Sequence, residues 1–257
     1  MFMEERHRLS LIIATLGPST DDPQELKTMI IAGIARQWTD GVDIARILHS
    51  DGESVSKDRA EKFREESEKR KCNTSIYLDT DDKNLQNFTK YLDFAKELQP
   101  EYISIFKKSG LDKIKEAKSA GFSKTKIGVR YEEDDSTDDI ESFLKEADFV
   151  MLELDSKKIA DEKLVIKSKE NNCEPIYLAR IPTLMKGQVQ SRDENFEIGH
   201  TLELGFDLVA LYQETAHGPY PARSVKCIDE IAVESEKLRM NPFGDFFDKI
   251  FSIFKKK

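Results

Sequence analysis

Short apolar runs alternate with longer amphipathic stretches along most of the chain. The short runs are almost continuously apolar rather than alternating, a pattern typical of strands covered on both faces. The eight predicted strands are Leu11–Thr15, Val42–Leu48, Ser75–Leu78, Tyr102–Phe106, Lys126–Tyr131, Phe149–Leu154, Pro175–Arg180 and Phe206–Leu211. Between them, apolar positions with a helical period predict helices over Lys57–Lys71, Asn84–Leu98, Leu111–Ala120, Ile140–Ala147, Ala160–Glu170 and Tyr220–Lys237.

This alternation predicts an α/β protein whose strands pair in parallel through crossover helices. A doubly wound open sheet also fits the alternation. Eight strands in a chain of 257 residues favour a closed (β/α)₈ TIM barrel, which needs about 250 residues. We assign residues 1–238 to this single barrel.

The last segment, residues 239–257, differs from the rest of the chain. It holds five of the 15 phenylalanines and ends in three lysines. Its apolar side chains form one helical stripe: Phe243, Phe246, Phe247, Ile250, Phe251 and Phe254. Two interpretations stay open. The segment is an amphipathic helix packed on the barrel or on a partner subunit, or Phe243–Lys257 is an interfacial helix that makes a peripheral membrane contact.

Composition excludes several classes of protein. Forty Lys and Arg against 49 Asp and Glu give a net charge of −9, which disfavours binding to nucleic acid. No apolar run approaches the roughly 20 residues of a membrane span. The three cysteines, Cys72, Cys173 and Cys227, are widely spaced and odd in number, which argues against a disulfide scaffold. Together with a charged N-terminus unlike a signal peptide, they predict a cytoplasmic protein.

Charged side chains follow most of the predicted strands, at the end of the barrel where the chemistry of this fold occurs. Three are arginines, whose planar fork suits phosphate or carboxylate: Arg46, Arg130 and Arg180. Glu132 and Asp155, on neighbouring strands, would share a hard divalent cation. The competing interpretation is that these arginines and carboxylates pair with each other.

Four segments resemble pyruvate kinase. Ile12–Ser19 (IIATLGPS) is similar to its opening strand, Gly41–Ile47 (GVDIARI) to its second and Leu78–Thr80 (LDT) to its third. The most specific match is Glu214–Pro221 (ETAHGPYP), which resembles the family's Gly-Glu-Thr-Ala-Lys-Gly-x-Tyr-Pro. The likeness runs in order from about Ile12 to Ser235 and implies a barrel of the phosphoenolpyruvate/pyruvate type.

The family has a lid domain after the third strand and a C-terminal regulatory domain. Here only residues 81–87 separate the third strand from the next predicted helix, and only the phenylalanine-rich segment follows Glu236. We therefore expect the barrel without its lid and without the regulatory domain.

The family's functional residues carry over unevenly. The resemblance makes Arg46 the phosphate-binding arginine and places substrate contacts on Glu214, Thr215 and His217, of which His217 stands at a lysine position. Arg130 replaces the catalytic lysine, and Arg180 replaces a threonine near the enolate.

The metal positions carry over in part as well. The resemblance implies a Mg²⁺ site at Glu132 and Asp155, the latter only with a gap in the alignment. It also implies a K⁺ site at Ser50, Asp79 and Thr80, in which Leu48 stands where the family has an asparagine.

Two functions follow. In the first, a degenerate pyruvate-kinase-like barrel without efficient phosphoryl transfer acts as a binding or interaction protein. Its mouth is then held by pairs of Arg130 with Glu132 and of Arg180 with Glu153 or Asp155. Its partner is an anionic small molecule, another protein or a second copy of the chain.

In the alternative, a lid-less magnesium-dependent enzyme acts on a pyruvate-like keto acid or a phosphorylated small molecule, or retains residual pyruvate kinase activity. Arg46 and Arg130 then hold the anionic group, and His49 or His217 moves a proton at neutral pH.

Overall fold

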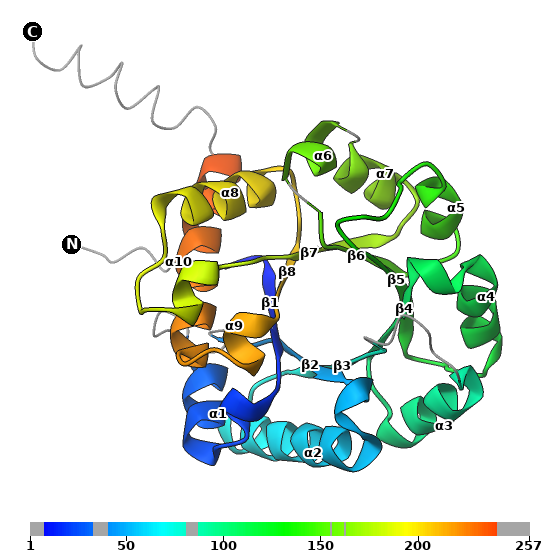
Figure 1. The fold of residues 1–257 in the computed structure, drawn as a ribbon, viewed down its shortest axis with the longest axis horizontal. Coiled ribbons are helices and arrows are strands. Elements are labelled where there is room, and N and C mark those ends of the chain that lie inside the picture. The colour runs from blue at the N-terminus through cyan, green and yellow to red at the C-terminus, as the bar shows by residue number, and fades with distance from the viewer. Residues whose placement is uncertain (1–7, 33–40, 81–86, 155, 162, 241–257) are drawn as a thin grey trace, which may run out of the picture.

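The computed structural model describes residues 8–32, 41–80, 87–154, 156–161 and 163–240. They form a closed barrel of parallel strands in the order β1 to β8, with each strand hydrogen-bonded to its neighbours in the sequence and β8 to β1. Helices ring the barrel (Figure 1). The predicted single (β/α)₈ barrel is confirmed. The phenylalanine-rich segment from Phe243 to Lys257 lies outside the described residues.

Every predicted strand overlaps an observed one. The strands are β1 Leu11–Thr15, β2 Ile44–Leu48, β3 Ser75–Asp79, β4 Tyr102–Phe106, β5 Lys126–Tyr131, β6 Phe149–Leu152, β7 Glu174–Leu178 and β8 Leu208–Leu211. Strands β6 and β7 end two residues earlier than predicted. Glu153 and Arg180 therefore lie in the loops at the mouth rather than on strands.

The helices are α1 Pro23–Ile30, α2 Glu53–Arg70, α3 Phe88–Leu98, α4 Leu111–Ser119, α5 Ile140–Leu144, α6 Ser156–Asp161, α7 Leu164–Glu170, α8 Arg192–Glu203, α9 Gln213–Ala216 and α10 Pro221–Met240. Short 3₁₀ helices follow four strands: η1 Pro18–Thr20, η2 His49–Asp51, η3 Lys107–Ser109 and η4 Pro182–Met185. The single helix predicted over Ala160–Glu170 belongs to two helices, α6 and α7.

Helices α1 and α8 were not predicted, although both begin with clear capping signals. The Asp22 side chain accepts hydrogen bonds from the backbone of Gln24 and Glu25, and Pro23 occupies the first turn of α1. Ser191 and Glu194 form a reciprocal capping box at the start of α8. Both helices could have been predicted from these capping residues.

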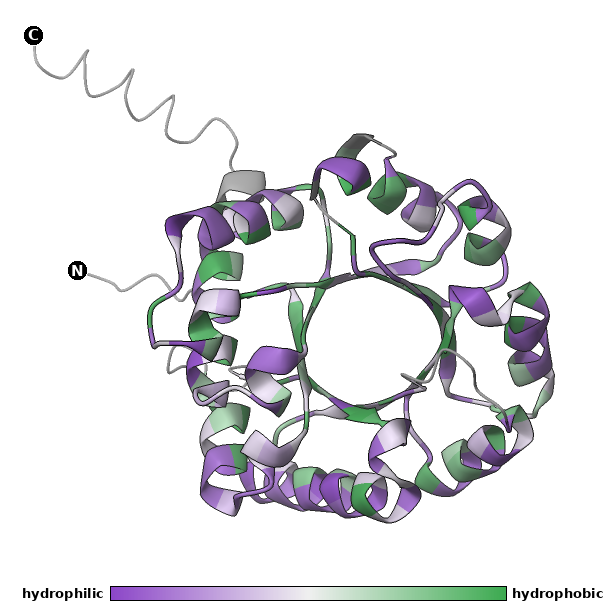
Figure 2. Ribbon diagram, in the orientation of Figure 1, coloured by the Kyte–Doolittle hydropathy of each residue, from purple (hydrophilic) through white to green (hydrophobic). Residues whose placement is uncertain are grey.

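Two layers of side chains make the core. One lies between the strands and the helices, and the other fills the barrel, where the rings of Tyr77 and Tyr102 each lie 5.5 Å from that of Phe149. Gly128 on β5 makes room for this ring, since a Cβ there would lie 2.4 Å from its carbon atoms. The strands are correspondingly hydrophobic, while the helices carry both hydrophobic and hydrophilic residues (Figure 2).

The alternation of side chains along each strand turns this apolar interior into a polar mouth. Every second residue of a strand faces the barrel axis. The residue two positions after an apolar inward residue therefore also faces inward, one layer nearer the mouth. On β1 to β5 the inward residues that come two positions after Ile13, Ile44, Tyr77, Tyr102 and Gly128 are Thr15, Arg46, Asp79, Ser104 and Arg130, all buried. The sequence thus places a polar layer on top of a hydrophobic plug.

The connections also bear on domain organisation. Strand β3 ends at Asp79 and α3 begins at Phe88, which leaves residues 80–87 between them, too few for an inserted domain. Of the helices that the structure describes, none combines the length and hydropathy of a membrane span.

Candidate functional site

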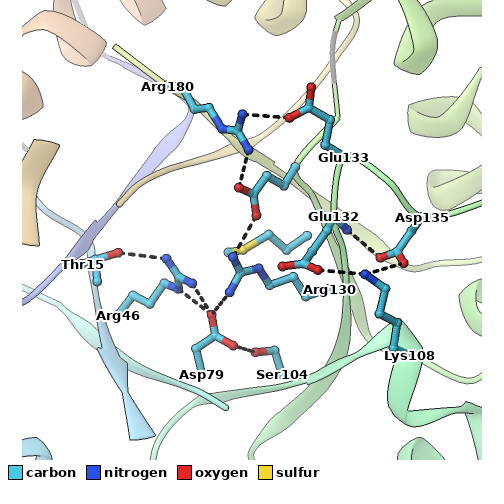
Figure 3. Close-up of polar contacts among 12 residues, drawn as sticks. Thr15, Arg46, Asp79, Ser104, Lys108, Arg130, Glu132, Glu133, Asp135 and Arg180 are labelled. Carbon is cyan, nitrogen blue, oxygen red and sulfur yellow. Dashed lines mark hydrogen bonds and ion pairs between the residues drawn. The ribbon is translucent and has the colours of Figure 1, made fainter. Parts of the chain in front are cut away.

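A buried carboxylate, Asp79 on β3, is the centre of the mouth (Figure 3). Its Oδ2 accepts hydrogen bonds from Arg46 Nε at 2.8 Å and from Arg130 Nη1 at 3.2 Å, and Arg46 Nη2 contacts the same oxygen. Its Oδ1 accepts from Ser104 Oγ at 2.6 Å. Burial alone would raise the pKa of Asp79, but the two guanidinium groups hold it well below its usual range. Asp79 is therefore an anion at neutral pH.

Arg46 on β2 is completely buried, with a relative exposure of 0%. Besides Asp79, it donates to Thr15 Oγ1 from Nη1 at 3.1 Å, and its Cζ lies 4.9 Å from the centre of the Tyr212 ring. A guanidinium out of contact with water is stable only where such partners replace its hydration. Protein groups supply them here.

From Arg130 a chain of ion pairs runs outward. Arg130 Nη2 donates to Glu153 Oε2 at 2.8 Å, and the other Glu153 oxygen accepts from Arg180 Nη2 at 2.6 Å. Arg180 Nη1 in turn donates to Glu133 Oε2 at 2.9 Å. Burial opposes the charge of Glu153, but hydrogen bonds from the two arginines lower its pKa overall. Three arginines thus alternate with three carboxylates, and the formal charges cancel.

The predicted pairing of the mouth is partly confirmed. The pair of Arg180 with Glu153 is present, whereas the expected pair of Arg130 with Glu132 is wrong. Arg130 points towards the barrel axis, where Asp79 and Glu153 lie. Glu132 instead accepts from Lys108 Nζ at 3.2 Å.

The residues expected to bind metals differ in their contacts and in their exposure. Asp79 is held between arginines, Thr80 is buried and Ser50 is exposed on η2. Asp155 lies outside the described residues. Within the described part of the chain, no three His, Cys, Asp or Glu side chains gather as a metal-binding group. Neither the Mg²⁺ site at Glu132 and Asp155 nor the K⁺ site at Ser50, Asp79 and Thr80 gains support from this geometry.

The segment Glu214–Pro221, expected to contact substrate, packs largely against the protein itself. The Glu214 side chain accepts from the backbone N–H of Ile181 at 2.6 Å, and Thr215 Oγ1 donates to the Tyr212 carbonyl at 3.3 Å. A Cβ on Gly17 would lie 2.5 Å from the Ala216 carbonyl oxygen. The two segments that best carry the resemblance are therefore in direct contact.

The two histidines considered for proton transfer differ in their surroundings. The His49 ring packs edge-on against Tyr91, with centroids 5.3 Å apart, and lies 5.7 Å from the ring of Phe94. His217 is exposed at the end of α9. The ring contacts of His49 indicate a packing role, and none of the ion pairs described for the mouth includes His217.

Arg180 lines two cavities. The first, here called the β7–β8 cavity, measures about 350 Å³ and is lined by the apolar surfaces of Leu178, Ala179, Pro182, Met185 and Tyr212. Its polar lining is Glu153, Arg180, Gln213 and Glu214. The second, here called the acidic cavity, measures about 280 Å³ and joins Arg180 to the carboxyl groups of Glu133, Glu153, Glu194 and Glu197.

Sequence reasoning missed Glu133, Lys108, Ser104, Met185 and Tyr212. Glu133 lies two residues after β5 and could have been predicted as a mouth residue. Tyr212 immediately follows β8, at the position that continues the inward alternation. Met185 has no such signal, because the turn η4 places it.

The chain matches no protein-family model and no curated protein sequence, so the proposals below rest on the geometry of the site and on the sequence resemblance.

Proposed function

We propose that the chain is a pyruvate-kinase-like barrel that acts as a binding or interaction protein and does not transfer phosphoryl groups efficiently. Its ligand is a small molecule that carries a carboxylate and binds at the mouth. The proposed family rests on the resemblance to pyruvate kinase, and the argument about activity rests on the ion pairs of the mouth.

The observation that carries this proposal is the position of Asp79 between Arg46 and Arg130. The resemblance makes Arg46 the phosphate-binding arginine and places Arg130 at the position of the catalytic lysine. To bind a phosphoryl group they would have to leave Asp79 as an unpaired carboxylate with a relative exposure of 0%. Breaking a buried pair in this way costs about 3–5 kcal/mol. Internal carboxylates thus take the place of a phosphate.

The absence of an inserted domain between β3 and α3 supports the same conclusion. Phosphoryl transfer depends on positioning and on a dry, charge-neutralised site. Without closure of a lid, water reaches the mouth, and Arg180 with its relative side-chain exposure of 55% is already hydrated.

A coupled assay tests the proposal. The chain is incubated with phosphoenolpyruvate, ADP, Mg²⁺ and K⁺, and pyruvate is detected through lactate dehydrogenase. We expect no turnover above that of a chain inactivated by heat, with an authentic pyruvate kinase as the positive control. Robust turnover would overturn the proposal.

One observation favours the magnesium-dependent alternative. Lys108 Nζ lies 3.2 Å from Glu132 and 3.5 Å from Asp135, so two carboxylates converge on one cation. In the alternative, Mg²⁺ replaces the ammonium group and the enzyme acts on a keto acid or a phosphorylated molecule. Calorimetry with Mg²⁺ and oxalate decides: metal-dependent binding that Glu132→Gln abolishes supports the enzyme, and binding without metal supports the binding protein.

A further inference from the structure

The two cavities beside Arg180 differ in chemistry. The β7–β8 cavity is mainly apolar, with Met185, Leu178 and the Tyr212 ring in its wall, and its volume of about 350 Å³ lies in the range of small-molecule sites. The acidic cavity borders the same guanidinium and is lined by four carboxyl groups together with apolar side chains such as Leu154 and Tyr177. The same cation therefore borders a mainly apolar cavity and a cavity rich in carboxyl groups.

Charge balance restricts what can bind there. Arg180 is paired with Glu153 and Glu133, and the whole row of mouth ion pairs is formally neutral. A simple anion that displaced Glu133 from Arg180 would leave an extra negative charge beside Glu153 and Glu214. A dianionic phosphate would leave two.

The outer pair is also the easiest to open. Glu133 has a side-chain exposure of 64% and Arg180 of 55%, so their ion pair contributes little stability and water can replace either partner. Glu153, with 13%, stays between Arg130 and Arg180. An incoming group therefore meets Arg180 at the position of Glu133.

We propose that the mouth binds the zwitterion of an apolar α-amino acid, with its carboxylate on Arg180, its ammonium group on the displaced Glu133 and its side chain in the β7–β8 cavity. The inference rests on the proposed binding function and names its ligand class. Inserting a zwitterion into an ion pair leaves the formal charge unchanged, and the Arg180 fork suits a carboxylate. Glu197 adds negative charge near the ammonium group: within the described residues its side chain forms no hydrogen bond or ion pair.

Calorimetric titration of the full chain with L-leucine tests the proposal. Three analogues each lack one feature: the keto acid of leucine has no ammonium group, isopentylamine has no carboxylate, and glycine has no apolar side chain. We expect saturable binding of leucine and at least about tenfold weaker binding of every analogue, the effect of about 1.4 kcal/mol. A keto acid that binds as tightly as leucine overturns the amino-acid assignment while leaving the proposed carboxylate-binding function intact.

Variants locate the site. Arg180→Gln is expected to weaken leucine binding by at least about tenfold, and Glu133→Gln to weaken leucine more than its keto acid. Arg192→Gln, on the exposed start of α8, is the matched control and is expected to bind leucine like the parent chain. Because Arg180 and Glu133 are exposed, both variants are expected to keep the parent's melting temperature. Unchanged leucine affinity in Arg180→Gln, or no saturable binding of leucine at millimolar concentration, overturns the proposal.

Discussion

The two ends of the barrel use carboxylates in different ways. At the amino-terminal end they accept hydrogen bonds from the backbone N–H groups near the strand starts: Asp43 from Ile12, Glu101 from Ile76, Asp148 from Ile127 and Glu236 from Leu9 and Ser10. At the mouth they accept from the guanidinium groups of Arg46, Arg130 and Arg180. The acceptor chemistry is the same, but the main donors differ: backbone amides at one end, joined by the Arg8 guanidinium at Asp43, and arginine side chains at the other.

This difference separates stability from binding. A backbone amide is fixed by its strand. A carboxylate that accepts from it therefore links two parts of the chain, and this hydrogen bond breaks only when the barrel opens locally. A side-chain donor can turn towards another acceptor, and the exposure of the ion pairs rises from Arg46 and Asp79 to Arg180 and Glu133. The amino-terminal end therefore holds the fold, and under the proposed function the outer mouth exchanges a protein carboxylate for that of a ligand.

The largest effect is expected at the buried centre of the mouth. Asp79→Ala leaves Arg46 and Arg130 without their shared anion in a buried site, and we expect a loss of about 3–5 kcal/mol in the free energy of unfolding. Urea denaturation followed by circular dichroism measures it. A loss below about 1 kcal/mol, typical of exposed pairs, would show that the mouth does not depend on Asp79.

A smaller effect is expected at the opposite end. Glu236→Gln keeps the shape of the side chain, but its amide has one acceptor oxygen, so it loses one of the two 2.7 Å hydrogen bonds from the backbone N–H groups of Leu9 and Ser10. We expect a loss of about 1–3 kcal/mol, because hydrogen bonds to charged groups are worth about that much. The same denaturation assay checks it, and leucine binding should not change. Loss of binding in this variant would contradict the separation of the two ends.

Acid should affect the two ends with opposite sign. The pKa of Glu153 is lowered, so its contribution to stability is present above its ordinary value of 4.5 and is lost as the pH falls through the folded value. Burial raises the pKa of Asp43 more than Arg8 lowers it, so the folded chain binds this proton more readily and gains stability as the pH falls.

Unfolding free energies measured in the acid range test this contrast. Glu153→Gln is expected to flatten the loss of stability in acid, and Asp43→Asn to steepen it. Equal pH profiles for the two variants would contradict the assignment.

The smallest stability effect is expected at the rim. Glu133→Gln removes a pair whose partners are both more than half exposed, and we expect a change of at most about 0.5 kcal/mol. Thermal denaturation checks this value. A larger loss would mean that the rim supports the fold and is not free for exchange.

Much of the fold was readable because local patterns determine it. Continuously apolar runs such as Phe149–Leu152, repeated between amphipathic stretches, indicate strands buried on both faces, and Leu11–Thr15 was predicted as β1 in this way. Helix α8 was missed, since its capping box at Ser191 carries the signal rather than its period.

The site was less predictable, because its ion pairs form between side chains that extend across the barrel. Sequence spacing does not determine which of these side chains meet. The pair of Arg180 with Glu153 followed from adjacent strand ends. The meeting of Arg46 and Arg130 at Asp79 did not, since it joins β2, β3 and β5 through inward side chains whose lengths decide the contact. The position of Met185 depends on the turn η4, for which the sequence offered no pattern.

A double-mutant cycle between Asp79 and Arg130 tests the central claim, that the cations of the mouth are neutralised by the protein's own carboxylates. Unfolding free energies are measured for the parent chain, Asp79→Ala, Arg130→Met and the double variant. We predict that the double variant is more stable than the sum of the single losses implies, by about 1.5–3 kcal/mol, because the second change removes a buried charge whose partner at 3.2 Å is already gone. Additivity to within about 0.5 kcal/mol would contradict the claim and return Arg130 to the role of a cation available to a phosphate.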